Sequence, residues 1–338
     1  GVWIMAYTDI DDPSAFFQCT LYVGNNGTQT VTHGGNSDLQ ADWIWGKARN
    51  DTAHHFLIDS VRGVSKRLKV AVDPEATVNA GITAIGSDSF AVGNDGDFND
   101  NNINYVTWNW KESADAGFDI LTYEGTGSIQ TEAHNLGVKP DMIMVKNIDS
   151  SDPPFNWRVY HSSLGAGVAL KLNANDAIAD DPGYWGDTEP TSSVFSIKDS
   201  GETNNNNQTY IAYLFAAKQG YSKFGSYTGN GNADGPFVFL GFKPAFLIIK
   251  KSSNAGNNWY MWDNKRNTSN LTNKYLNPDL NAAEGTANYG YIDFLSNGFK
   301  TRATGNTDEI NQSGHTFIYM AFAENPFVSS TGVPGTAK

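Results

Sequence analysis

Apolar positions along the chain fall into short blocks that predict β-strands. The blocks at 142–145 and 246–249 are each four apolar residues long and are bounded by proline and polar turns. Such a block is typical of a strand covered on both faces, or covered on one face by a neighbouring repeat. Clusters of Asn, Asp, Gly and Ser, such as 94–104 and 199–208, separate the blocks and favour turns. Sustained helical periodicity with caps is absent, so the sequence predicts an all-β fold with little or no helix.

A set of landmarks recurs three times in the same order. A tyrosine followed two residues later by glycine begins each copy, at Tyr22, Tyr123 and Tyr227. The blocks ADWIWGK (41–47), PDMIMVK (140–146) and PAFLIIK (244–250) come next, and each copy closes with an aromatic strand. Corresponding landmarks lie about 100 residues apart, which is the length of a complete β-sandwich domain.

The repeat predicts three tandem β-sandwiches, either jelly-roll-like or Ig-like. Their expected bounds are 1–112 for a divergent first repeat, 113–219 for the second, and 220–338 for the third with a C-terminal tail. The repeats either stack end to end as a shaft or close around a pseudo-threefold axis. The sequence leaves both arrangements open.

Composition narrows the classes of partner. The 338 residues carry a net charge of −13, which opposes binding to a nucleic-acid backbone. The chain lacks the run of roughly 18 apolar residues that membrane insertion needs. One cysteine, Cys19, excludes an intrachain disulfide framework and a thiolate-rich zinc site. The first residues show neither a signal-peptide pattern nor an initiator Met, which indicates a fragment or a processed chain.

The sequence offers no specific catalytic motif, and we predict a protein that is not an enzyme. His161 of the second repeat corresponds to Asp59 and Asp263 in the others, and a shared catalytic base would not alternate in this way. Glycoside hydrolysis needs only two facing carboxylates. A glycan hydrolase therefore stays an alternative in a chain with 36 acidic residues.

The acidic loop at 94–100 is a candidate cation site. Asp95, Asp97 and Asn99 offer oxygen ligands at alternate positions, as a calcium loop does. The loop lacks the glutamate and the flanking helices of an EF-hand, and an ordinary turn is the favoured alternative. No cofactor is predicted other than this possible Ca²⁺.

The loop 180–190 is a candidate carbohydrate site. Aromatic rings stack on sugar faces while polar groups bind sugar hydroxyls. Tyr184 and Trp185 lie in this loop, and the other repeats have no equivalent pair. We therefore expect an exposed aromatic patch here, with Tyr184, Trp185 and Asp187 as carbohydrate-binding residues.

Several runs carry a likeness to a known family: HNLGVKPDMIMVKN (134–147), PTSSVFSI (190–197), SKFGSYTGNGNADGPFVFLGFKPAFLIIK (222–250), DFLSNGFKTR (293–302) and FIYMAFAENPF (317–327). They resemble the tandem repeats of uncharacterised virion proteins of marine tailed bacteriophages. The resemblance covers residues 118–327 closely, whereas the first repeat matches in outline, with His33-Gly34-Gly35…Ala41 in place of a Gly-Leu-Gly-x-x-Pro segment.

The resemblance implies a place on the virion exterior, as a tail fibre, spike, appendage or capsid-surface component. The expected function is structural and non-enzymatic, with loops that bind a host surface glycan. The expected partners are other virion proteins, in a homotrimer or a capsid-ordered array. Two alternatives stay open: a tailspike-type glycan hydrolase that uses a pair of carboxylates, and a secreted lectin-like carbohydrate-binding module.

Overall fold

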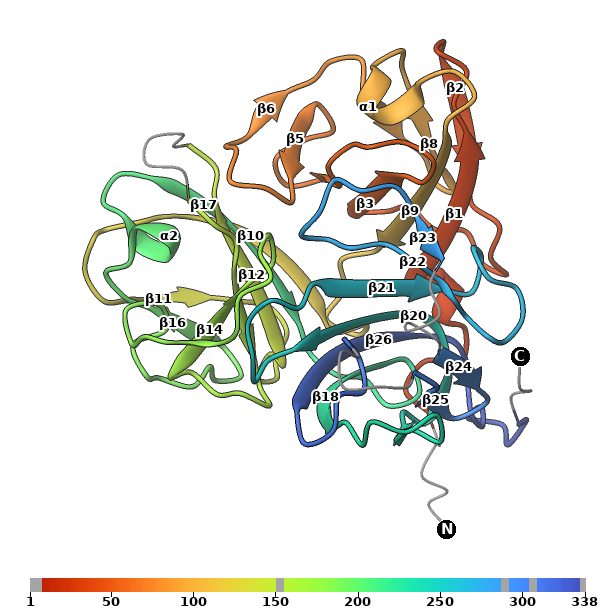
Figure 1. Ribbon diagram of the computed structural model, residues 1–338. Helices are drawn as coiled ribbons and strands as arrows, with labels where there is room; N and C mark the ends of the chain where they lie inside the picture. The colour runs from red at the N-terminus through yellow and green to blue at the C-terminus, as the bar shows by residue number, and fades with distance from the viewer. Residues whose placement is uncertain (1–7, 150–154, 287–291, 304–308, 335–338) are drawn as a thin grey trace, which may run out of the picture.

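The chain forms antiparallel sheets that fall into three groups along the sequence. The computed structural model describes residues 8–149, 155–286, 292–303 and 309–334, and these are organised almost entirely around β-strands (Figure 1). The helical elements among these residues are two four-residue helices and a 3₁₀ turn, η1 (Pro13–Ala15). The predicted all-β fold with little helix is therefore confirmed. We call the described parts of 8–112, 113–219 and 220–334 lobes 1, 2 and 3.

Lobe 1 contains a large sheet, a small sheet and the short helix α1 (Gly96–Asn99). The large sheet has the order β1-β9-β3-β4-β5-β6 and the small sheet the order β2-β8-β7. The strands are β1 (Phe17–Val23), β2 (Gln29–Thr32), β3 (Trp43–Ala48), β4 (Phe56–Asp59), β5 (Lys66–Lys69), β6 (Ala76–Thr77), β7 (Ile82–Ile85), β8 (Ser89–Val92) and β9 (Asn104–Trp110).

Lobe 2 repeats this plan with a small sheet of two strands and the helix α2 (Gly201–Asn204). The sheet orders are β10-β17-β12-β13-β14-β15 and β11-β16. The strands are β10 (Phe118–Glu124), β11 (Gln130–Ala133), β12 (Met142–Asn147), β13 (Arg158–His161), β14 (Val168–Lys171), β15 (Ala179–Asp180), β16 (Val194–Ile197) and β17 (Thr209–Phe215).

Lobe 3 has a four-stranded large sheet, β18-β26-β20-β21, a small sheet, β19-β25-β24, and a separate pair, β22-β23. The strands are β18 (Ser222–Thr228), β19 (Phe237–Phe239), β20 (Phe242–Lys251), β21 (Trp259–Asp263), β22 (Lys274–Tyr275), β23 (Gly285–Thr286), β24 (Ile292–Leu295), β25 (Gly298–Thr301) and β26 (Thr316–Pro326).

The three large sheets share one strand order at their first four positions. These are β1-β9-β3-β4, β10-β17-β12-β13 and β18-β26-β20-β21. Their register also corresponds, because the tyrosine of each opening motif pairs with an aromatic residue of the closing strand: Tyr22 with Tyr105, Tyr123 with Tyr210, and Tyr227 with Phe317. Positions in the three lobes can therefore be compared one by one.

The opening Tyr-x-Gly motif fixes the same contact in each lobe. The tyrosine hydroxyl donates to a backbone carbonyl near the end of the lobe: Tyr22 to Phe98 (2.6 Å), Tyr123 to Thr203 (2.7 Å) and Tyr227 to Ile310 (2.6 Å). Its glycine lies against the same turn, where a Cβ would come within 2.0–2.3 Å of a carbonyl oxygen at Gly24, Gly125 and Gly229. Glycine is required because no side chain fits there.

Each lobe has its own apolar cluster between its large and small sheets. In lobe 2, for example, Ile143 and Val145 of β12 pack with Phe195 of β16. Equivalent clusters fill lobe 1 and lobe 3. The two packed layers make each lobe sandwich-like.

The opposite faces of the three large sheets pack together in one central core. Met142 and Met144 of β12 enter it with Trp43, Trp45 and Phe246 from the other lobes. Because successive residues of a strand point to opposite faces, each apolar block is covered by its own small sheet on one side and by the other lobes on the other. The lobes therefore share a core, and their division into separate domains at 112 and 219 stays a prediction.

The lobes close into a ring. A backbone N–H of each lobe donates to a backbone carbonyl of the next: Glu75 to Ile148 (3.0 Å), Ile178 to Ser252 (3.1 Å) and Glu284 to Arg49 (2.6 Å). Lobe 1 thus bonds to lobe 2, lobe 2 to lobe 3, and lobe 3 back to lobe 1. Of the two arrangements that the sequence left open, the structure has the closed one.

Candidate functional site

The alternating position 59/161/263 lies at the junctions between lobes. Asp59 accepts the Tyr213 hydroxyl (2.6 Å), Asp263 accepts the Trp108 indole N–H (3.2 Å), and His161 Nε2 donates to the Tyr319 carbonyl (3.2 Å). Each of the three side chains is buried, and each bond reaches a neighbouring lobe. Burial lowers the pKa of His161 to about 4 and keeps the ring neutral. These groups hold the ring of lobes together.

The two aspartates of this set have an arginine partner three residues later. Asp59 accepts Arg62 Nε at 2.7 Å, and Asp263 pairs with Arg266. Burial alone would raise the pKa of Asp263, but the charge of Arg266 and its hydrogen bonds outweigh burial and lower it. A buried carboxylate with such partners is a structural ion pair.

The acidic loop of lobe 1 uses its predicted calcium ligands in protein contacts. Asp95 caps α1 by accepting the Asp97 N–H (3.0 Å), and Asp97 pairs with Arg67. Asn99 is buried, and its Nδ2 donates to Gly93 O (2.7 Å) and Gly27 O (2.8 Å). Among the residues that the structure describes, no three His, Cys, Asp or Glu side chains are grouped so that they could hold a metal ion.

The predicted exposed aromatic pair in lobe 2 is buried, and that expectation is wrong. Tyr184 is 8% and Trp185 2% exposed, while Asp187 faces solvent. The Arg158 guanidinium lies 4.0 Å from the centre of the Tyr184 ring, and Trp185 meets Tyr160 edge-on at 6.0 Å. The two rings are part of the lobe 2 core.

The reason for this burial is the two-stranded small sheet of lobe 2. Lys198 and Ser200, next to β16, donate backbone bonds to Tyr184 O (3.1 Å) and Gly183 O (3.2 Å). In lobes 1 and 3 a third strand, β7 or β24, covers this part of the core. In lobe 2 the 180–190 loop takes that place.

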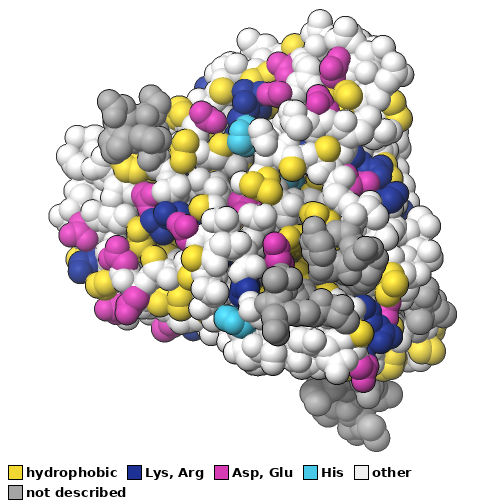
Figure 2. All heavy atoms as spheres, viewed as in Figure 1, with side chains coloured by type: hydrophobic (Ala, Val, Ile, Leu, Met, Phe, Trp, Pro, Cys, Tyr) yellow, Lys and Arg dark blue, Asp and Glu magenta, His cyan; other side chains and the backbone are white. Residues whose placement is uncertain are grey.

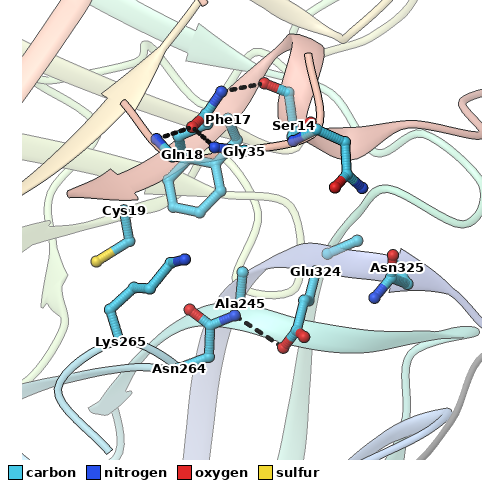
Figure 3. A pocket seen from close by; sticks show the side chains of 13 residues that line it. Ser14, Phe17, Gln18, Cys19, Gly35, Ala245, Asn264, Lys265, Glu324 and Asn325 are labelled. Carbon is cyan, nitrogen blue, oxygen red and sulfur yellow. Dashed lines mark hydrogen bonds between the residues drawn. The ribbon is translucent and has the colours of Figure 1, made fainter. Parts of the chain in front are cut away.

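A pocket of about 240 Å³ opens between lobes 1 and 3. Figure 3 shows its two walls, with Ser14, Phe17, Gln18 and Gly35 on one side and lobe 3 residues facing them. The polar side chains of the lining supply a hydroxyl, amides, an ammonium and a carboxylate, from Ser14, Gln18, Asn36, Asn264, Asn325, Lys265 and Glu324. The lining combines these donors and acceptors with the apolar side chains of Phe17, Ala245 and Ala323.

The lobe 1 wall is built by the segment in which the first repeat departs from the others. Gln18 Oε1 accepts the N–H groups of Gly34 (3.1 Å) and Gly35 (2.6 Å), and its Nε2 donates to Ser37 O (2.8 Å). A Cβ on Gly35 would lie 2.5 Å from the Gln18 side chain. The absence of a side chain at Gly35 therefore allows the loop to wrap around Gln18 and form the wall.

The lobe 3 wall is organised by Glu324. Its carboxylate accepts Lys243 Nζ (2.9 Å) and Asn264 Nδ2 (2.7 Å), the second of which Figure 3 marks. Lys265 reaches along the pocket beside Cys19. Burial raises the pKa of the Cys19 thiol well above its usual range, which disfavours the nucleophilic thiolate at neutral pH.

Lobe 3 has an alanine in this pocket where the other two lobes have an aspartate. In lobe 1 Asp42 accepts the Glu112 N–H (2.8 Å), and in lobe 2 Asp141 accepts the Ala217 N–H (2.8 Å). The corresponding residue of lobe 3 is Ala245, which lines the pocket. The sequence carried this signal, because the second position of the repeated block reads Asp, Asp, Ala. The pocket residues were not singled out from the sequence.

Two carboxyl groups lie in direct contact at the junction of lobes 1 and 2. Glu112 is hydrogen-bonded to Asp119, and its Oε1 also accepts the Ile120 N–H (3.1 Å). Partial burial and the neighbouring Asp119 and Asp42 raise the pKa of Glu112 to about 7. Hydrogen-bonded carboxyl groups are closer than the roughly 5 Å or more that separates the pair in glycosidases.

The visible surface carries mixed charge. On the face in Figure 2, Lys and Arg side chains are interspersed with Asp and Glu, and the backbone and other uncharged side chains cover most of the area. In the part of the chain that the structure describes, no helix is long and apolar enough to cross a membrane.

Comparison with known proteins places the chain in a family without assigning it an activity. A search of curated proteins finds no match to this sequence. A family model described as a domain of unknown function, DUF7483, matches residues 12–326. This single match extends over all three lobes, as does their central core. The chain therefore belongs to the DUF7483 family.

Proposed function

We propose that this protein is a non-enzymatic structural component of the exterior of a phage particle and that it binds a host surface glycan in the pocket between lobes 1 and 3. The particle assignment rests on the sequence resemblance. The closed ring supports a structural role, because buried bonds such as Tyr213–Asp59 join the lobes without disulfides.

The observation that carries the binding proposal is the lining of the pocket. Sugar hydroxyls donate and accept hydrogen bonds, and hydroxyl, amide and carboxylate groups match both roles. Ser14, Asn264 and Glu324 supply such groups beside the apolar side chains of the lining. A volume of about 240 Å³ is below that of pockets for drug-sized ligands and suits one sugar ring rather than a long oligosaccharide.

A symmetry argument supports this choice of site. Residues that hold a lobe together recur in three copies, as Asn99, Asn204 and Asn311 do. A specialised binding site is expected where one copy departs from the others. Ala245 and the loop that Gln18 holds both depart, and they face each other across this pocket.

The test is binding of free monosaccharides (hexoses, N-acetylhexosamines and hexuronic acids) followed by saturation-transfer NMR. The variant Ala245→Asp/Glu324→Ala gives lobe 3 the residue pair that lobe 2 has in Asp141 and Ala217. We expect at least tenfold weaker binding from this variant because its carboxylate occupies part of the pocket. The matched control Ser162→Asn, at the lobe 2 position of Asn264, should bind like the wild type.

Two results would contradict the proposal. Equal binding by the wild type and the filled-pocket variant would place the sugar elsewhere. Depolymerisation of a host polysaccharide by the purified protein would show an enzyme. The particle assignment is checked separately by immunogold electron microscopy of phage particles that encode this chain, in which surface labelling is the expected result.

A further inference from the structure

Strand β19 of lobe 3 exposes two phenylalanines. Phe237 is 47% and Phe239 is 53% exposed on the outer face of the small sheet. The strands at the same place in the other lobes, β2 and β11, carry Thr30 and Thr32, and Thr131 and Ala133. Lobe 3 thus presents aromatic rings where the other lobes present small side chains, and such apolar patches mark contact surfaces.

A pocket of about 430 Å³ continues this patch. Its apolar lining includes Phe239, Leu240 and Phe327, and its charged lining residues are Lys218 and Lys223. Lys223 Nζ donates to the Phe239 carbonyl (2.7 Å) and lies 5.4 Å from the centre of that ring. This bond occupies an acceptor on the open edge of β19, so side-chain docking is favoured over addition of a strand.

An acidic groove lies directly beside the pocket and shares Lys218 with it. Its acidic lining residues are Asp9, Asp11, Asp12 and Asp115, and Phe16 contributes an apolar wall. The segments touch, because the Asp9 N–H donates to the Gln219 carbonyl (3.1 Å). Hydrogen bonds from Ser330 lower the pKa of Asp11, which keeps this exposed carboxylate charged.

We propose that this continuous surface joins two copies of the chain in a two-fold symmetric pair, with the acidic groove of each copy facing the Phe239 pocket of the other. A two-fold contact requires a self-complementary patch. Here the lysine-lined pocket and the acidic groove lie side by side and share Lys218. A two-fold rotation about an axis near Lys218 therefore places the lysines of each copy against the carboxylates of the other. A head-to-tail ring would need the two sets on separate faces.

The placement of opposite charges on this surface supports a second copy as the occupant. With a net charge of −13, two copies repel each other over most orientations. The lysine-lined pocket of one copy instead attracts the acidic groove of the other. A two-fold contact of this kind occurs within capsid-ordered arrays, whereas an isolated homotrimer has none.

The first experiment measures self-association of the full chain by sedimentation velocity across a concentration series. We expect a monomer–dimer equilibrium that weakens with added salt. The variant Phe237→Thr/Phe239→Thr should weaken the pair at least tenfold while keeping the wild-type melting temperature, because threonine occupies the corresponding positions of lobe 1. The control Val23→Thr removes an equally exposed apolar side chain (53%) from β1 and should associate normally.

The second experiment uses charge reversal with rescue. The variants Lys218→Glu/Lys223→Glu and Asp9→Lys/Asp115→Lys should each be folded monomers, because like charges face each other in both contacts. Mixed in equal amounts they should form a heterodimer, because each supplies the charges that the other lacks. A wild type that stays monomeric, a trimer, or folded variants that fail to pair when mixed would each overturn the proposal.

Discussion

Asp59, His161 and Asp263 occupy one position in three lobes, yet they differ in charge. The facing residue explains the difference. Tyr213 and Trp108 each donate a hydrogen bond to an aspartate, whereas the corresponding residue of lobe 3, Met320, has no donor. A neutral histidine that donates to a backbone carbonyl avoids burying a carboxylate beside a thioether. The sequence shows the alternation, but only the contacts show its cause.

Glu112 gives stability a defined pH dependence. Its folded-state pKa of about 7 lies above the ordinary 4.5, so folding favours the protonated form. Its contribution is therefore full below about pH 4.5 and is lost as the pH rises to about 7. Glu112→Gln keeps a neutral side chain at every pH, and we expect it to raise the free energy of unfolding at pH 8 relative to the wild type, with little difference at pH 4. Urea unfolding across this range measures the effect.

Buried histidines change the free energy of unfolding with pH in the opposite direction to Glu112. The effect of Glu112 is therefore measured as the difference between the wild type and Glu112→Gln. The pKa of His161 is lowered to about 4, so its contribution is present above pH 6.5 and is lost as the pH falls. Subtracting the two stability profiles removes this background. Parallel profiles for wild type and variant would show that folding does not raise the pKa of Glu112.

At the scale of single elements, the strands follow from their own sequence. Alternation along β12 assigns Met142 and Met144 to one face and Ile143 and Val145 to the other, and both faces are apolar. The burial of the 180–190 loop, in contrast, cannot be predicted from the local sequence. Tyr184 and Trp185 are buried because lobe 2 has two strands in its small sheet, and that count depends on tertiary pairing. The candidate pocket could not be predicted from the sequence for a related reason. Ala245 lines a pocket only because the lobe 1 loop at Gly34 and Gly35 lies opposite it in the folded chain.

The turn that receives each opening motif should not tolerate a side chain at its glycine. In Gly125→Ala the new Cβ would lie 2.2 Å from the Asn205 carbonyl oxygen, so β10 and the residues after α2 must separate. We expect a loss of about 1–3 kcal/mol in the free energy of unfolding. Gly34→Ala is the matched control, because its Cβ meets nothing within 4 Å. Equal urea midpoints for the two variants would show that the turn accommodates the Cβ of Gly125→Ala without a loss of unfolding free energy.

The whole molecule is held by a core that belongs to no single lobe. Trp43 of lobe 1 stacks on Tyr213 of lobe 2 (4.7 Å), and Trp110 of lobe 1 meets Phe246 of lobe 3 (5.6 Å). The spacing of landmarks indicates three copies but not how their faces meet. Ring closure depends on contacts between residues far apart in the chain, which spacing does not encode.

A shared core predicts one cooperative unfolding transition for the full chain. Scanning calorimetry should give equal calorimetric and van't Hoff enthalpies. The fragment 113–219 alone would expose Met142, Met144 and Trp157 to water, and we expect it to show no cooperative transition. Separate transitions for the three lobes, or a stably folded fragment, would contradict this prediction.

The differences between the three junctions also determine which lobe can pack beside which. A chain built from similar units is prone to pair the wrong neighbours, within itself or with another chain. If lobe 3 docked where lobe 2 belongs, Asp59 would meet Met320 and lose the hydrogen bond that Tyr213 donates. Each junction thus discriminates against foreign neighbours, and the ring accepts only one cyclic arrangement of its parts.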